Sequence, residues 1–145
     1  MSKSQKTWLI VTAVFQMLTF LMHSLSLVAT PEPANDAEKQ MLELMFTYRI
    51  NMGAGFHPTM FNILTSFSIC FSLLLLLGGL LCILLVRHKA TGPLPQSIMA
   101  AQTVIFLACF VAMMVFTFMI PVVCVGLITA SCITSWWTYK MAPNP

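Results

Sequence analysis

The chain has 145 residues, of which 59% are hydrophobic and only 8% are charged, and its formal net charge is +3. A soluble globular domain has about 25% charged residues, so this composition excludes that class and is typical of an integral membrane protein. The small positive excess gives no support for a nucleic-acid partner, because its lysines and arginines flank apolar segments, as expected from membrane topology.

Four apolar segments are long enough to cross a bilayer, which takes about 20 predominantly apolar residues in a helix. They predict an all-α fold, an integral membrane four-helix bundle that forms a single membrane domain over residues 1–145. The first segment is longer than the apolar region of a secretory signal, and we interpret it as a retained helix. The predicted spans are residues 8–29, 59–86, 97–118 and 121–137.

Polar residues follow one face of the first span, at intervals of four, three, four and three. At about 100° per residue, they fall within an arc of roughly 80°. A polar face inside a membrane turns away from lipid, so this pattern predicts contact with other helices. The residues are Thr12, Gln16, Thr19, His23 and Ser26.

Other spans offer partners for this polar face. Asn62 and Ser66 lie near the outer end of the second span, and Gln102 lies in the third at a depth that suits a hydrogen bond to Gln16. One interpretation is structural, since hydrogen bonds between membrane helices average about 0.6 kcal/mol. The other is a pocket for a lipid-soluble molecule, such as a quinone or a sterol-like compound, with His23 as a donor or proton acceptor.

The segment 30–58 is the one long connection, and its prolines end the first helix. Asn35 and Glu38 have the spacing of a capping box, although Asn is a weaker match than Ser or Thr. Apolar residues then recur at spacings of three and four. This pattern predicts a short external amphipathic helix between the first two spans, lying on the membrane or capping the bundle.

Three residues near the end of this segment, Tyr48, Arg49 and His57, form a candidate site at the outer mouth, with Asn62 just below. Arg49 is suited to clamp an anionic head group or a carboxylate, and His57 to assist it. The structural alternative is that Arg49 pairs with Glu43 or caps backbone carbonyls, while His57 precedes a helix start.

The shorter connections predict close helix neighbours. In the link between the second and third spans, Gly92, Pro93 and Pro95 are expected to stop helices. The third and fourth spans form a tight antiparallel hairpin, with Pro121 acceptable in the first turn of the fourth. In the second span, the paired glycines 78 and 79 permit close helix contact.

Positive residues predict that both termini are cytoplasmic, because lysine and arginine favour that side of a membrane. Under a four-span topology, five of the seven positive residues belong to one side, and every acidic residue belongs to the other. The five are Lys3, Lys6, Arg87, Lys89 and Lys140.

Motifs for catalysis or metal binding are missing from the sequence. The spans hold no Asp or Glu, which disfavours carboxylate-coupled proton exchange. The cysteines all fall in spans and form no C-x-x-C pair, so neither a disulfide framework nor a structural zinc site is indicated. We therefore assign no catalytic or metal-binding residue, lean against an enzyme, and leave cofactors open. We interpret the cysteines as small apolar packing residues. They are Cys70, Cys82, Cys109, Cys124 and Cys132.

Three stretches, "FLMHSL", "TYRINM" and "FHPTMFNILTSFSICFSLLLLL", carry a family resemblance over about the first two-thirds of the chain. Together they resemble a group of small bacterial four-helix membrane proteins of uncharacterised activity. DoxX-like proteins share the four-span plan but no residue motif. The resemblance implies the four-helix fold and a location in the bacterial cytoplasmic (inner) membrane.

Small size, the missing catalytic motifs and twelve methionines, which make adaptable packing surfaces, favour an accessory or interaction subunit of a membrane complex. Its partners are then the lipid bilayer and other membrane subunits or further copies of itself. The second hypothesis is the ligand pocket around His23. The third is a small transporter that works as an oligomer.

Overall fold

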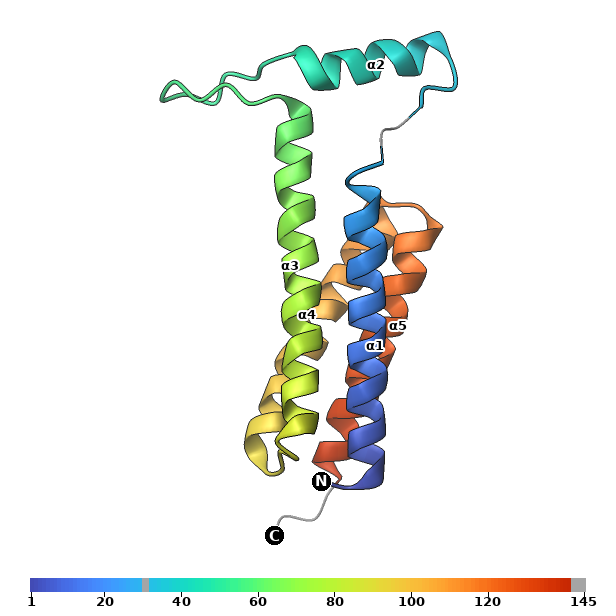
Figure 1. The fold of residues 1–145 in the computed structure, drawn as a ribbon, viewed down its shortest axis with the longest axis vertical. Coiled ribbons are helices and arrows are strands. Elements are labelled where there is room, and N and C mark those ends of the chain that lie inside the picture. The colour runs from blue at the N-terminus through green and yellow to red at the C-terminus, as the bar shows by residue number, and fades with distance from the viewer. Residues whose placement is uncertain (30–31, 142–145) are drawn as a thin grey trace. The chain divides into compact units, whose positions relative to one another are not determined.

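The computed structural model describes residues 1–29 and 32–141. Four of the helices in that part of the chain are long and apolar enough to cross a membrane, so the chain is a multi-pass membrane protein. The all-α class and the short helix between the first two spans are confirmed. The helices in Figure 1 are α1 (Lys3–Ser26), α2 (Asp36–Thr47), α3 (Met60–Arg87), α4 (Pro93–Phe116) and α5 (Met119–Lys140).

The start of α4 corrects the sequence prediction. The prolines at 93 and 95 were expected to stop helices and leave residue 97 as the start of the span, but α4 begins at Pro93. A proline fits the first turn of a helix, since its missing N–H would have no partner there and its φ is already helical. Gly92 precedes it with φ 87°, a conformation that favours glycine. At α5, Pro121 lies in the first turn, as predicted.

The chain folds as two compact units, each described by itself. The bundle unit comprises Met1–Leu21 and Leu75–Pro145, and the α2 unit comprises Met22–Leu74. The bundle unit therefore holds most of α1, the second half of α3, and all of α4 and α5.

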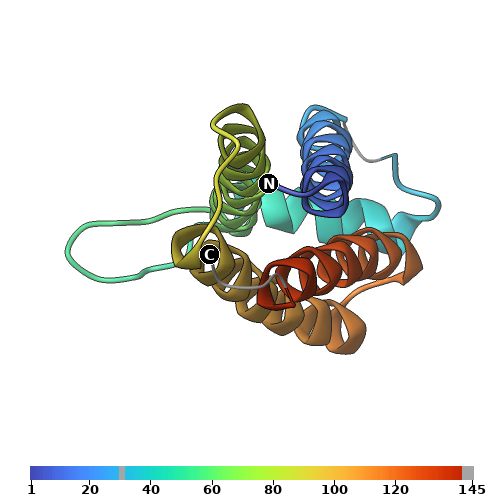
Figure 2. The ribbon, with the colours of Figure 1, turned by 90° about the horizontal axis from the view of Figure 1, so that it is seen from below.

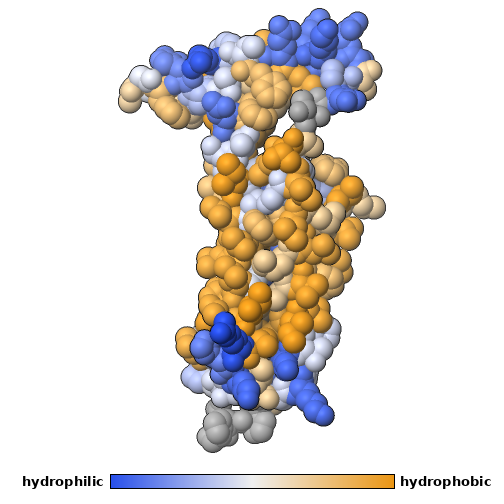
Figure 3. All heavy atoms as spheres, in the orientation of Figure 1, coloured by the Kyte–Doolittle hydropathy of each residue, from blue (hydrophilic) through white to orange (hydrophobic). Residues whose placement is uncertain are grey.

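In the bundle unit, α4 and α5 lie side by side as an antiparallel pair, as Figure 2 shows from one end. The start of α1 meets the end of α5, where the Gln5 side chain donates to the Thr138 carbonyl oxygen at 3.4 Å. On the face that Figure 3 shows, hydrophobic side chains cover most of the bundle and hydrophilic ones gather at this end. The largest fully buried apolar side chains are Phe106, Leu9, Leu75, Met99 and Ile128.

The paired glycines of α3 bring it close to α1, as predicted. A Cβ atom at Gly78 would lie 2.8 Å from Nε2 of Gln16, and one at Gly79 would lie 2.8 Å from Sδ of Met17. Such distances are shorter than ordinary contacts, so the two side chains can lie this close to the α3 backbone because neither glycine carries a Cβ atom.

The α2 unit is organised by local caps and a narrow loop. The Asn35 side chain accepts a hydrogen bond from the Glu38 N–H at 2.9 Å, while Glu38 Oε2 accepts one from the Ala34 N–H at 2.7 Å. The Asn35 bond confirms the predicted helix start, whereas Glu38 reaches back to the Ala34 N–H and not to the Asn35 N–H of a regular capping box. On the other side of α2, Phe46 stacks on Phe61 of α3, with ring centroids 4.4 Å apart. This contact between two aromatic rings packs the end of α2 against the start of α3.

Candidate functional site

The bundle unit buries two glutamines that face each other. Nε2 of Gln16, on α1, donates to Oε1 of Gln102, on α4, at 2.9 Å. The two side chains are almost fully buried, at 0% and 6% exposure. Their predicted hydrogen bond is confirmed.

The other two helices of the bundle complete this polar cluster. Nε2 of Gln102 donates to the Gly78 carbonyl oxygen at 3.5 Å and lies 3.8 Å from Sγ of Cys82, both on α3. Nε2 of Gln16 lies 3.9 Å from Sγ of Cys132, on α5. We interpreted the cysteines only as apolar packing residues. Four-residue spacing put Gly78 and Cys82 on one face of α3, but nothing in the sequence showed that Gln102 lies against that face.

This cluster is chemically neutral. It contains two amides, two thiols and a backbone carbonyl, with no carboxylate or imidazole to act as acid or base. One lone group remains: among the described residues, Oε1 of Gln16 is buried and has no hydrogen-bond partner. The arrangement is suited to holding four helices in register by hydrogen bonds that lipid cannot replace.

The remaining residues of the predicted polar face do not belong to this cluster. Two of them, Thr12 and Ser26, donate their hydroxyl hydrogen bonds to backbone carbonyl oxygens of α1. The Thr12 hydroxyl is buried and donates to the Trp8 carbonyl oxygen at 2.9 Å. Thr19 is half-buried. Ser26 is exposed and donates to the His23 carbonyl oxygen at 2.7 Å. It also lines a cavity of about 410 Å³ together with residues of α2 and α3.

His23 lies in the α2 unit and is half-buried. Its ring meets Phe71 of α3 edge-on, with centroids 5.3 Å apart and an interplanar angle of 87°. Nε2 is buried and, within the described part of the chain, has no hydrogen-bond partner. The histidine therefore packs as an aromatic ring, and its Nε2 atom forms no hydrogen bond to the described residues.

Asn62 and Ser66 are exposed, and the structure groups them with the predicted mouth residues. Together with Arg49 and His57 they line a cavity of about 480 Å³. Apolar side chains, including Phe56, complete its walls. The position of Asn62 just below Arg49 and His57 agrees with the prediction, and Ser66 is the residue whose place differs from it. Both follow from helix direction, because Asn62 and Ser66 occupy the first two turns of α3, directly after the loop that carries Arg49.

Arg49 is held at the rim of this cavity by the loop backbone. Its guanidinium donates to the His57 carbonyl oxygen at 3.5 Å, as the structural alternative expected. The loop is narrow, since the Ile50 N–H donates to the Pro58 carbonyl oxygen at 2.9 Å. A guanidinium has five N–H donors, so most of them are left for a ligand or water. Tyr48 is exposed and does not belong to the cavity wall.

No protein-family model, curated protein or solved structure matches the chain. Within residues 1–29 and 32–141, no group of three His, Cys, Asp or Glu side chains is placed to hold a metal ion. The family resemblance stays a prediction, and function has to be argued from the sites themselves.

Proposed function

We propose that this protein is a non-enzymatic interaction subunit of the cytoplasmic membrane, which uses α2 to dock on a partner membrane protein. The observation that carries the proposal is the surface of α2. This helix has no buried residue, yet apolar side chains recur along it and stay exposed, with Met41 at 53% and Leu44 at 62%. An amphipathic helix in this state is suited to cover another apolar surface.

The polar residues of the bundle support the same function. Gln16 and Gln102 form hydrogen bonds to each other and to neighbouring helices. These bonds favour a structural role for the buried glutamines over a ligand pocket in that part of the bundle. The chain then contributes a stable membrane scaffold and an adaptable helix. By the positive-inside rule, α2 lies on the outer side and both termini in the cytoplasm.

Site-specific photo-crosslinking in intact cells tests this function. A crosslinking residue at Leu44 samples the apolar face of α2, and one at Glu43 samples the opposite, polar face as a matched control. We expect one protein adduct of constant mass from position 44 and none from position 43. The adduct should disappear when Met41→Glu breaks the apolar face. Adducts with lipid alone would show that α2 merely rests on the bilayer and would refute the docking function.

The cavity around Arg49 supports a second candidate, binding of a lipid-soluble molecule with an anionic group. Arg49, His57, Asn62 and Ser66 gather at one cavity whose other walls are mainly apolar. Charge-assisted hydrogen bonds from arginine suit a carboxylate, and the walls suit an alkyl chain. This modifies the His23 hypothesis, because His23 is not part of that wall.

A fluorescent long-chain fatty acid is the probe for this candidate. Loss of a hydrogen bond to a charged group costs about 1.5–3 kcal/mol, so Arg49→Gln should weaken binding by roughly ten-fold or more. Lys39→Gln removes the same charge from α2, outside the cavity wall, and should leave the affinity unchanged. Equal effects of the two variants would refute a site at Arg49.

A further inference from the structure

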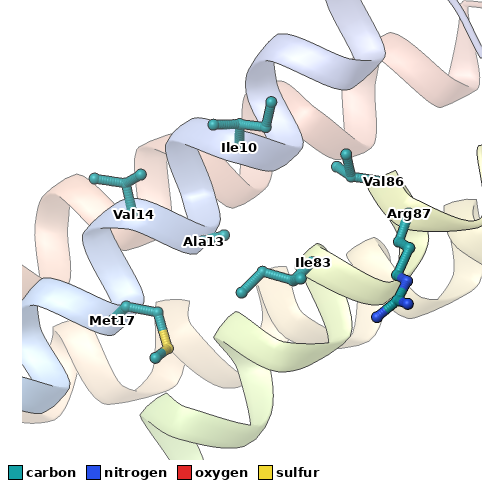
Figure 4. Close-up of a pocket in the computed structure, with 7 residues that line it drawn as sticks. All are labelled: Ile10, Ala13, Val14, Met17, Ile83, Val86 and Arg87. Carbon is teal, nitrogen blue, oxygen red and sulfur yellow. The ribbon is translucent and has the colours of Figure 1, made fainter.

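The bundle unit has a groove between α1 and α3 that the function above does not use. Its volume is about 340 Å³, at the small end of the range for ligand sites, and its walls are almost wholly apolar. Figure 4 shows that the walls come from both helices, with Met17 at one end and Arg87 at the other. The lining residues are Ile10, Ala13, Val14, Met17, Ile83, Val86 and Arg87.

The tight contact at the α3 glycines ends the groove on one side. Met17 lies against Gly79 and also lines the groove, so its side chain lies between the two helices at this point. From Ile10 to Met17 the groove follows α1 for about 10 Å, at 1.5 Å per residue. This shape fits a segment of one alkyl chain rather than a compact ligand.

The other end of the groove is basic. Arg87 is exposed and belongs to the groove wall itself. On α1, Lys6 precedes Ile10 by four residues and Lys3 precedes Lys6 by three, so both lysines lie on the groove face of that helix, and both are exposed. Arg87 in the groove wall and two lysines on the groove face of α1, beyond Ile10, therefore make this end of the groove basic.

These cations have no acidic side chain in their own unit. All four acidic residues, Glu32, Asp36, Glu38 and Glu43, belong to the α2 unit. The positive charge at the groove end is thus not neutralised by carboxylate side chains of the bundle unit, and it is complementary to an anionic head group.

We propose that this groove binds an anionic phospholipid, with one acyl chain between α1 and α3 and the phosphate at Lys6 and Arg87. The basic end supplies the charge complementarity, and the apolar walls supply a seat for the chain. A neutral phospholipid can contact the same apolar walls, but it should bind with lower affinity because its head group has no net negative charge to interact with the cations.

Native mass spectrometry of the full chain in mild detergent tests this proposal, with phosphatidylglycerol and phosphatidylcholine titrated separately. Each basic residue near a membrane surface contributes about the equivalent of a five-fold change in affinity, so Lys6→Gln with Arg87→Gln should weaken phosphatidylglycerol binding roughly thirty-fold. Phosphatidylcholine binding should be unchanged. The matched control, Lys89→Gln with Lys140→Gln, removes two charges outside the groove wall and should change the affinity less than three-fold.

A second pair of variants tests the acyl-chain seat without changing charge. Val14 is 55% exposed, so Val14→Trp should fill the groove without disturbing the core and abolish phosphatidylglycerol binding. Val104→Trp, on α4 and 68% exposed, should have no effect. The proposal is overturned if both charge pairs weaken binding equally, if Val14→Trp binds normally, or if inorganic phosphate competes as well as the lipid does.

Discussion

Gln16 and Gln102 join α1 to α4 through a buried hydrogen bond of 2.9 Å, in a part of the bundle where neither lipid nor water competes for it. A double-mutant cycle with Gln16→Leu and Gln102→Leu should give a coupling energy of about 0.6–2 kcal/mol. Each single variant strands the other amide, whereas the double variant removes both. The free energy of unfolding, measured by SDS titration in mixed micelles, provides the values.

The two single variants should lower the free energy of unfolding by different amounts. Gln102→Leu removes the second hydrogen bond to the Gly78 carbonyl oxygen as well as the partner of the Gln16 amide, so it should destabilise more than Gln16→Leu. Additive effects in the cycle would contradict the hydrogen bond as a source of bundle stability.

Gly78→Ala and Gly79→Ala should have opposite effects, although the two glycines are neighbours. At Gly78, the new methyl group would meet the amide of Gln16, which its hydrogen bonds hold in place, and we expect a loss of about 1–2 kcal/mol. At Gly79, it would meet the flexible end of Met17, which can move aside. The gain in helix propensity, up to about 1 kcal/mol, should then leave Gly79→Ala neutral or stabilised in the same titration. Equal losses would contradict this difference.

The sequence predicted the hydrogen bond between Gln16 and Gln102 because both the helix face and the membrane depth of these residues could be derived from it. The 3.6-residue period gave the face of α1, and the rise per residue gave the depth of Gln16 and Gln102. Period and depth do not say which faces of the other helices turn inward. The thiols of Cys82 and Cys132, which complete the cluster, were for that reason interpreted only as apolar packing residues.

The wrong predictions have similarly specific causes. Proline is common both in the first turn of a helix and just after its end, so the sequence does not distinguish the two cases, and the structure shows that Pro93 starts α4. The sequence also places Ser66 beside the polar face of α1, whereas its grouping with Arg49 depends on the pairing of the loop between Ile50 and Pro58, which has no sequence signature. Local signals such as the Asn35 cap were read correctly because each depends on neighbouring residues alone.

The cap of α2 provides a local prediction. Asn35→Ala removes the acceptor for the Glu38 N–H and should cost about 1 kcal/mol of helix stability. Amide hydrogen exchange in the first turn of α2 should therefore be about five-fold faster. Asn51→Ala is the matched control, because the Asn51 side chain accepts from the Gly53 N–H in the loop and should leave the exchange of α2 unchanged. Unchanged exchange in Asn35→Ala would show that packing, not the cap, holds the helix start.

The proposed topology predicts which introduced thiols a membrane-impermeant maleimide reaches in intact cells. Thr47→Cys, at the end of α2, should react from outside, whereas Lys89→Cys, in the α3–α4 link, should react only after the cells are permeabilised. The unmodified chain measures the background from its native cysteines. The reverse pattern would invert the topology and would place the basic groove end on the outer side.

His23 provides the last prediction, because its Nε2 atom is buried without a partner while its ring packs edge-on against Phe71. Phenylalanine keeps the aromatic contact and removes the polar atom. If the histidine has only a packing role, His23→Phe should raise the free energy of unfolding by about 1 kcal/mol, since a stranded buried polar group costs that much or more. His23→Ala should lower it by losing the ring contact. A stability loss in both variants, together with a change in the retention of a short-chain quinone probe, would instead show that a ligand satisfies Nε2 in the membrane.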